Sequence, residues 1–471
     1  MTAGRIAFCA LLGLACAEGH PDASEPSASL SVSDFGAIGD GQALDTAAIQ
    51  EAVDALPPGG VLRFPPGTYR IEADRGIRLK DDVRLDLGRA VIVGANVDGA
   101  RCRLFEIEGR RNVTITGGTL VGSRGGSPEW GMGILASDAE DLVIENVALR
   151  DFYYDGIILT GNRGCRRVAV RGVVSENNRR TGLAVVHAEG VTVEDSTFAG
   201  TRGQSPEAGV NCEPNRGEEV RNVRFRGCTF RGNANKGLYM HRALGVGVAN
   251  ASVEGSLVEE NGYGIVANGV DGLTIRDNHV RGHRGRKTPA IVVGEADRPV
   301  IAGNRLEDNF RGIFSAGATA AEIRENTVVG TGPESEAGPG EGGDGIVCLG
   351  LKGPLADACV VTDNTVRRCA GSGIVAQLVS RVRLEDNTIE DVGQRGIFLR
   401  TTSASEVRGN SVSAAGGEAG ERYDAIELAF ASSDNTVAAN VIRLGAGTRQ
   451  AIGICAACRG NQVTGNVVLP D

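Results

Sequence analysis

The chain has 471 residues, a formal net charge of −10 and an isoelectric point near 5.3. It contains no run of basic residues, which argues against nucleic acid and anionic membranes as partners. Glycine contributes 69 residues, about twice its usual share, whereas aromatic residues make up only 4%. This composition favours a fold with many tight corners and a narrow aliphatic interior.

The N-terminus has the features of an export signal followed by a linker. Residues 1–16 carry one positive charge at Arg5, then an apolar stretch that ends at Cys16. The stretch is too short to span a bilayer, so we expect a signal peptide and a secreted, periplasmic or cell-surface protein. The residues around Cys16 also resemble a bacterial lipoprotein cleavage site, which would make Cys16 a lipid anchor. Residues 17–30 are expected to form a flexible tether.

Residues 31–100 are predicted to contain an N-terminal cap and the first coils of a repeat. Thr46 can cap a helix whose apolar residues Ile49, Val53 and Leu56 lie on one face. Two prolines and two glycines end this helix, and a strand follows them. A helix and strand in this order can cover the open end of a repeat protein, which would otherwise expose backbone groups.

The cap segment also carries recognisable motifs. They are Asp34-Phe35-Gly36-Ala37, Gly39-Asp40-Gly41, Asp45-Thr46-Ala47-Ala48-Ile49-Gln50 and Phe64-Pro65-Pro66-Gly67-Thr68-Tyr69. This segment resembles the N-terminal signature of the pectate lyase superfamily, which includes family-28-like glycosidases, alginate epimerases and phage tailspikes. The resemblance implies an all-β, right-handed parallel β-helix and a polysaccharide partner. We also expect the protein to be a monomer. It covers about 40 residues that build the cap, so it bears on the fold more than on the chemistry.

Residues 101–471 contain a repeated motif, in which a small residue is followed by an aliphatic residue at the start of a short apolar run. The small residues are Gly133, Gly156, Gly182, Gly209, Gly237, Gly264, Ala290, Gly312, Gly345, Gly373, Gly396, Ala425 and Ala451. Their mean spacing of about 26.5 residues is typical of a solenoid. Leucine-rich repeats and propeller blades do not fit the pattern. The repeat predicts a single-domain parallel β-helix of about 13 coils, roughly 60 Å long.

A second motif lies between these runs and ends in asparagine. Its clearest copies end in Asn278, Asn304, Asn326, Asn364, Asn387, Asn410, Asn440 and Asn466. We expect these side chains to form a ladder of amides that hydrogen-bond from coil to coil, rather than a ligand site.

Nine of the eleven cysteines follow the signal segment. Cys212 and Cys348 occupy inward-facing positions of the repeated strand and are expected to be small core residues. Cys455 and Cys458 have the spacing of half a metal site, but no second pair accompanies them. A disulfide or two free thiols is therefore the expected state of this pair.

The outward-facing positions of the repeated strand are mostly apolar or small, with one polar island. Counting the small residue as zero, positions 2 and 4 face outward and give Asn211, Glu213, Tyr239 and His241. Four more side chains are expected to border this island: Lys236, His187, Asp155 and Tyr154. Three long turns, 123–131, 201–209 and 331–345, precede repeated strands and are expected to form a wall beside it.

The polar island suits the cleavage or epimerisation of an acidic polysaccharide. Both reactions need a group that neutralises the uronate carboxylate, a base for the C5 proton and an acid. Tyr239 and His241 are candidates for acid and base, and Lys236 is an alternative base. Asn211 and Glu213 are candidates for orienting the sugar or holding Ca²⁺; no metal ligand set is assigned. The family resemblance implies this type of site, although the epimerases' Asp-Pro-His triplet is missing.

Two other interpretations remain open. Hydrolysis needs two carboxylic acids across the scissile bond, for which Glu213 with Asp155 or Glu207 are candidates. The signature motifs of the family-28 galacturonases are missing from the relevant coils. A non-catalytic surface protein that binds glycans or mediates adhesion would use the same island as a passive or structural patch.

Overall fold

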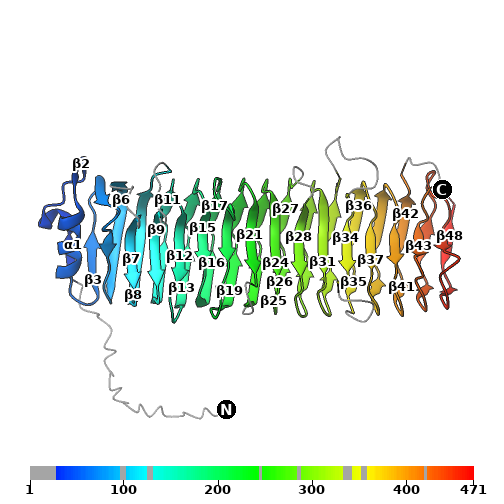
Figure 1. Ribbon diagram of the computed structural model, residues 1–471. Helices are drawn as coiled ribbons and strands as arrows, with labels where there is room; N and C mark the ends of the chain where they lie inside the picture. The colour runs from blue at the N-terminus through cyan, green and yellow to red at the C-terminus, as the bar shows by residue number, and fades with distance from the viewer. Residues whose placement is uncertain are drawn as a thin grey trace, which may run out of the picture.

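The computed structural model describes residues 28–95, 102–124, 131–242, 247–283, 288–332, 342–351, 358–417 and 422–470. These residues form one elongated rod of stacked parallel strands, which runs from a helical N-terminal end to the last coil (Figure 1). The described part contains one α-helix and one short 3-10 helix, and otherwise strands and turns. The predicted all-β parallel β-helix is confirmed.

One wall of the rod is a 15-stranded parallel sheet, which we call the site sheet. Its strands in spatial order are β5 (Ile77–Arg78), β7 (Cys102–Glu108), β9 (Gly131–Ser137), β12 (Asp155–Thr160), β15 (Thr181–Val185), β18 (Ala208–Cys212), β21 (Lys236–His241), β24 (Tyr263–Asn268), β28 (Pro289–Gly294), β31 (Arg311–Ala316), β34 (Ile346–Leu349), β37 (Ile374–Gln377), β40 (Ile397–Arg400), β43 (Ile426–Ala429) and β46 (Ile452–Ile454).

The described rod therefore has about 15 coils rather than the predicted 13. The two additional strands, β5 and β7, precede the first counted copy of the repeat. At β7, Phe105 pairs with Ile77 on one side and Ile134 on the other. Leu104 precedes Phe105 at the position where most later coils have glycine. The repeat motif is therefore absent from this coil, and the sequence pattern misses it.

The remaining strands form two parallel ladders, which cover the other walls of the rod. The long strands β6 (Val83–Ala95) and β8 (Arg111–Val121) join the ladders, because each pairs with strands of both. For example, β8 pairs with β10 (Glu140–Glu145) and with β11 (Ala148–Arg150). Inward-facing aliphatic side chains of all walls pack into one continuous core.

The N-terminal end of the rod is covered by α1 (Thr46–Ala55), which follows the 3-10 helix η1 (Val32–Phe35) (Figure 1). Ile49 and Val53 are fully buried, as the amphipathic pattern predicts. The helix therefore closes the core at this end and shields the first coil from other chains.

Two details of the cap differ from expectation. Asp45, and not Thr46, occupies the N-cap position of α1. The hydroxyl of Thr46 instead accepts a hydrogen bond of 2.8 Å from the backbone N–H of Glu72. Strand β1 (Ser29–Ser31) pairs with β3 (Gly60–Arg63), so the sheet begins within the last two residues of the segment expected to be a tether.

The predicted asparagine ladder is present. From Asn304 to Asn466, each side-chain oxygen of this series accepts hydrogen bonds from the backbone and side-chain amides of the asparagine one coil earlier. The oxygen of Asn278, the first in the series, accepts from the backbone N–H of Ser256. At Asn364, these bonds come from Asn326 and measure 2.9 and 3.0 Å. The Asn364 amide also donates to the carbonyl of Ile323 at 2.8 Å. The ladder thus satisfies buried backbone groups at one corner of the coil.

A histidine replaces asparagine in a second, shorter ladder. His283 lies between Asn261, whose Nδ2 is 3.4 Å from His283 Nε2, and Asn309, whose Oδ1 is 3.0 Å from His283 Nδ1. An amide donor on one side and an oxygen acceptor on the other fit a neutral imidazole protonated at Nδ1. Burial lowers the pKa of His283 from 6.5 to about 4.

The neutral form of His283 should make the fold sensitive to acid. Because its pKa is lower in the folded chain, its contribution to stability is present above pH 6.5 and is lost as the pH falls toward 4. His283→Asn, which restores an amide rung, should remove an acid-dependent loss of about 3 kcal/mol in the free energy of unfolding. Urea unfolding across this pH range measures the effect. His279→Gln, at a half-exposed surface histidine, is the control, and an unchanged profile in H283N would contradict the prediction.

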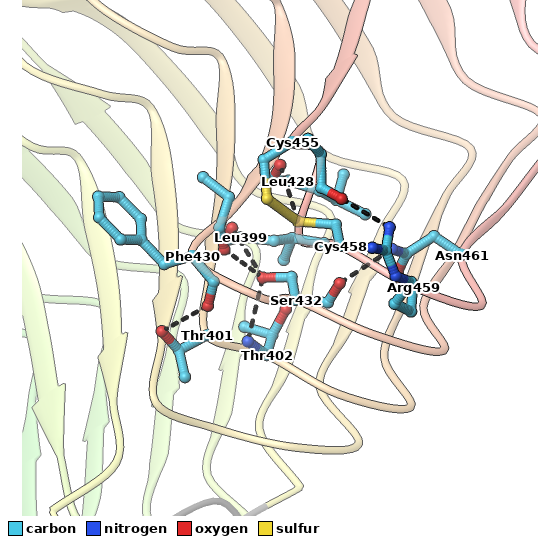
Figure 2. Close-up of a disulfide and its surroundings, with 12 residues drawn as sticks. Leu399, Thr401, Thr402, Leu428, Phe430, Ser432, Cys455, Cys458, Arg459 and Asn461 are labelled. Atoms are coloured by element: carbon cyan, nitrogen blue, oxygen red, sulfur yellow. Dashed lines mark hydrogen bonds between the residues drawn. A yellow bond between two sulfur atoms is a disulfide. The ribbon is translucent and has the colours of Figure 1, made fainter.

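The cysteines agree with the core prediction and extend it. Cys212 and Cys348 are buried, and Cys348 Sγ lies 2.7 Å from Cys359 Sγ. Cys455 and Cys458 form a disulfide in the turn after β46, and this turn packs on Leu428 of the preceding coil (Figure 2). The disulfide alternative for this pair is therefore the one observed.

The expected signal peptide and the Cys16 lipid anchor lie outside the described residues. Within the described ranges, no helix has the length and apolar character needed to cross a membrane.

Candidate functional site

The parallel pairing of the site sheet brings the predicted polar island together. Asn211 of β18 pairs in register with Tyr239 of β21, one coil later. Glu213 directly follows β18, and His241 ends β21. Lys236 begins β21 and pairs with Tyr263 of β24. Residues about 27 positions apart in the chain thus become lateral neighbours on the outer face of one sheet.

Glu213 is the centre of the island. Its Oε2 accepts a hydrogen bond of 2.6 Å from Asn211 Nδ2 and lies 3.4 Å from Arg180 Nη2. Its Oε1 lies 3.4 Å from His241 Nε2, a contact too poorly aligned to count as a hydrogen bond. The neighbouring His241 and then Asn211 lower the pKa of Glu213 against the opposing effect of burial, so this carboxylate remains ionised under mildly acidic conditions.

Two stacked rings and an ammonium group lie beside this carboxylate. The rings of Tyr239 and His241 are parallel within 14°, with centroids 4.3 Å apart. Lys236 Nζ lies 4.3 Å from the centroid of Tyr239 and 5.7 Å from that of Tyr263. Burial lowers the pKa of Lys236, and burial followed by the charge of Glu213 raises the pKa of Tyr239. The lower pKa makes Lys236 easier to deprotonate, and the higher pKa keeps the Tyr239 hydroxyl protonated.

Two buried polar atoms of the island lack hydrogen-bond partners among the described residues. They are Asn211 Oδ1 and His241 Nε2. A buried polar group without a partner is costly, and such groups are usually satisfied by water or a ligand. The unsatisfied atoms belong to residues that flank the half-exposed Glu213. The island therefore retains hydrogen-bonding capacity for a bound molecule.

Asp155, a predicted substrate-binding residue, is fully buried behind the island. It accepts hydrogen bonds of 3.1 Å from Arg180 Nη1 and 2.6 Å from the hydroxyl of Thr181. Burial raises the pKa of Asp155, although Arg180 and Thr181 oppose the shift. Tyr154 lies under the guanidinium of Arg180, 4.8 Å from its carbon to the ring centroid. Asp155 and Tyr154 thus position Arg180, and the burial of Asp155 leaves its carboxylate no surface for a sugar.

The same arrangement recurs far from the island, which supports a structural role for Asp155. Asp424 is also fully buried and also follows a tyrosine, Tyr423. It accepts a hydrogen bond of 2.7 Å from Arg449 Nε, with Gln450 Nε2 at 3.4 Å. In both places, an arginine and a polar residue of the next coil compensate a buried carboxylate at the start of a strand.

The structure gives His187 and Glu207 local contacts with turns. His187 Nδ1 lies 2.8 Å from the carbonyl oxygen of Gly161, at the corner beyond β15. Glu207 Oε1 accepts a 2.8 Å hydrogen bond from the backbone N–H of Gly203 and braces its own turn. Its charge still acts on Lys236. The other predicted wall turns fall largely outside the described residues, at 125–130 and 333–341.

The island does not fit a calcium ion well. Asn211 directs its amide nitrogen, and not its oxygen, at Glu213, and Arg180 contacts the same carboxylate oxygen. Within the described ranges, no group of three histidine, cysteine, aspartate or glutamate side chains is arranged to hold a metal.

Comparison with known families assigns the chain. A family model described as right-handed beta helix region matches residues 215–353 and 355–469, more than half of the sequence. The chain belongs to the right-handed β-helix family. A second model, described as rhamnogalacturonase A/epimerase, pectate lyase-like, matches residues 29–258 of this β-helix. The superfamily resemblance carried by the cap motifs is thereby confirmed.

Individual relatives are distant. This β-helix is 25% identical over 431 residues to the uncharacterized protein YclG of Bacillus subtilis (strain 168), covering 80% of this chain and 66% of YclG. It is 29% identical over 188 residues to mannuronan C5-epimerase AlgE6 of Azotobacter vinelandii, covering 35% of this chain and 21% of AlgE6. The chain thus spans just under two thirds of YclG and a smaller part of AlgE6.

Solved structures support the fold. The A-module of AlgE6 superposes with a TM-score of 0.54 at 20% identity, covering 94% of this β-helix and 99% of the module. An N-terminal fragment of bacteriophage Phi29 gene product 12 superposes with a TM-score of 0.60 at 13% identity, covering 93% of each chain.

Arg180 and Tyr263 are site residues that the sequence pattern missed. Arg180 lies just before β15 and Tyr263 is the first residue of β24, so both fall outside the outward positions 2 and 4 that define the island. Arg180 connects the buried Asp155 to Glu213, and Tyr263 flanks Lys236. Lys236 and Tyr263 each stand directly before the repeated glycine of their coil. A comparison of this position from coil to coil could therefore have identified Tyr263 from the sequence.

The link between Arg180 and Asp155 can be tested by stability measurements. Arg180→Met should lower the free energy of unfolding by about 3–5 kcal/mol at neutral pH, because it leaves Asp155 buried without its cation. The double variant D155N/R180M, which removes both charges, should recover most of this loss. Urea unfolding of the three proteins provides the comparison. A double variant no more stable than R180M would contradict the pairing.

Proposed function

We propose that this β-helix acts on an acidic polysaccharide at the polar island, by β-elimination. The observation that carries the proposal is the convergence of Glu213, Tyr239, His241 and Lys236 on one sheet face, where two buried polar atoms lack hydrogen-bond partners among the described residues. The similarity to a mannuronan C5-epimerase over 188 residues supports a polysaccharide as the ligand.

The proposed roles follow from the geometry. The ammonium of Lys236 neutralises the uronate carboxylate, which makes the C5 proton more acidic. His241 accepts this proton, and Glu213 orients its ring and balances the resulting charge. The C4–O bond breaks as the C4–C5 double bond forms, and the Tyr239 hydroxyl donates a proton to the leaving oxygen. Lys236 is the alternative base, since burial lowers its pKa.

The arrangement of the two rings favours elimination over epimerisation. Tyr239 and His241 belong to one strand and stack in parallel 4.3 Å apart, so they approach a sugar from the same side. Epimerisation at C5 requires proton removal from one face of the ring and proton delivery to the other. It is the second candidate, favoured by the relationship to AlgE6.

Hydrolysis has less support. It requires two carboxyl groups that face each other across the bond. Asp155 is buried against Arg180 and Thr181, and Glu207 Oε1 is bonded to its own turn. Neither predicted carboxylate partner of Glu213, Asp155 or Glu207, is therefore placed to face it across a glycosidic bond.

The proposal is tested with purified protein on alginate, pectate and glycosaminoglycans. Elimination should generate the ultraviolet absorbance of an unsaturated uronate, and His241→Gln and Tyr239→Phe should each lower kcat by about 10²–10⁴-fold. His279→Gln, on another wall, is the matched control and should keep full activity. Inverted C5 configuration without chain cleavage would select epimerisation. Binding without any product would replace catalysis by a glycan-binding or adhesive role.

We also propose that the chain is exported, on the basis of residues 1–16. Expression in a bacterial host followed by cell fractionation should place the protein outside the cytoplasm. If Cys16 is lipidated, Cys16→Ala should release the protein from the membrane fraction into the soluble fraction. Retention of both forms in the cytoplasm would contradict export.

A further inference from the structure

A hollow of about 230 Å³ lies on the outer face of the site sheet, on the N-terminal side of the island. Strands β7, β9 and β12 form it, and its lining includes Arg103, Glu106, Glu108, Met132, Leu135 and Thr160. Neither the proposed reaction nor the predicted site residues use these side chains.

The hollow and the island share one column of paired residues. The column runs in register across six strands through Glu106, Leu135, Ile158, Ala184, Asn211 and Tyr239. Leu135 and Asn211 are three strand spacings apart, or about 14 Å at 4.8 Å per strand. Ile158 and Ala184, which lie between the two places, are buried with Met132 in a small apolar cluster, against which Leu135, Tyr154 and Val186 pack. A polymer lying along the rod axis can therefore reach from the island into the hollow without crossing a corner.

The chemistry of the hollow differs from that of the island. Arg103 donates to Glu106 Oε2 through Nε at 3.1 Å and Nη2 at 2.9 Å, and both side chains are mostly buried. Glu106 thus compensates the charge of Arg103. The exposed Arg78 also lies 3.8 Å from Glu106 Oε2, and its charge is offset by the exposed Glu108. The partly exposed Leu135, which packs against the buried Met132, supplies apolar surface. The local charges therefore balance, and a second uronate would find no excess of positive charge here, whereas an uncharged sugar offers an apolar ring face and hydroxyl groups.

We propose that the hollow binds an uncharged sugar unit of the same polysaccharide whose acidic unit is held at the island. This inference rests on the proposed function and narrows its substrate to a heteropolymer that contains both neutral and acidic units. It also implies a chain long enough to bridge the distance from Asn211 to Leu135.

The test fills the hollow and compares polymers. Leu135→Trp should raise KM about tenfold for a uronate polymer that contains neutral sugars, with kcat within about twofold. It should have no such effect on a pure polyuronate, for which the wild-type KM should already be about tenfold higher. Val174→Trp, at an exposed position on another wall, is the matched control for adding a tryptophan. Thermal unfolding checks the fold of L135W, and Thr160→Gln blocks the same hollow if L135W is unstable.

Affinity electrophoresis in polysaccharide-containing gels separates this proposal from the proposed function. In the inactive H241Q background, L135W should still weaken retention by the heteropolymer. Equal KM values of the wild type for both polymers, or an equal effect of L135W on both, would overturn the hollow as a neutral-sugar site and leave the reaction standing. Absence of both binding and turnover in the wild type would overturn both proposals.

Discussion

The structure depends on the in-register stacking of parallel strands from one coil to the next. Each strand of the site sheet pairs along its length with the coils before and after it, so a position within the repeat becomes a continuous column along the rod. Because side chains alternate between the two faces, a shift of one residue would exchange core and surface along the whole strand. The buried aliphatic positions hold the register, and the outward columns can then vary without disturbing it.

Stacking also creates a problem, because corners bury polar backbone groups in every coil. The asparagine ladder solves it with one side chain per coil that both donates and accepts. The histidine at position 283 performs the same task only while neutral, which links that corner to pH. The buried carboxylates Asp155 and Asp424 are compensated in a different way, by an arginine from the next coil.

Arg180 connects this scaffold to the proposed site. One of its terminal nitrogens contacts the fully buried Asp155, and the other contacts the half-exposed Glu213. The position of Glu213, and through it the environment of His241, therefore depends on a contact with a fully buried carboxylate. A rigid scaffold of this kind suits a site whose rings and charges must be held in place before a substrate binds.

The sequence by itself determined the fold class, the repeated strand, the asparagine ladder and the outward position of Asn211, Glu213, Tyr239 and His241. These features follow from local periodicity and stacking, since every coil obeys the same alternation. Only the tertiary structure decided which of the neighbouring side chains contact the island and which are buried or hydrogen-bonded elsewhere. Asp155 is buried, His187 contacts Gly161 in the turn of the preceding coil, and Glu207 is hydrogen-bonded within its own turn. Arg180 and Tyr263 lie at the island instead. The direction of a side chain at a corner depends on the exact path of the turn and on the partner in the next coil, and periodicity carries no information about either.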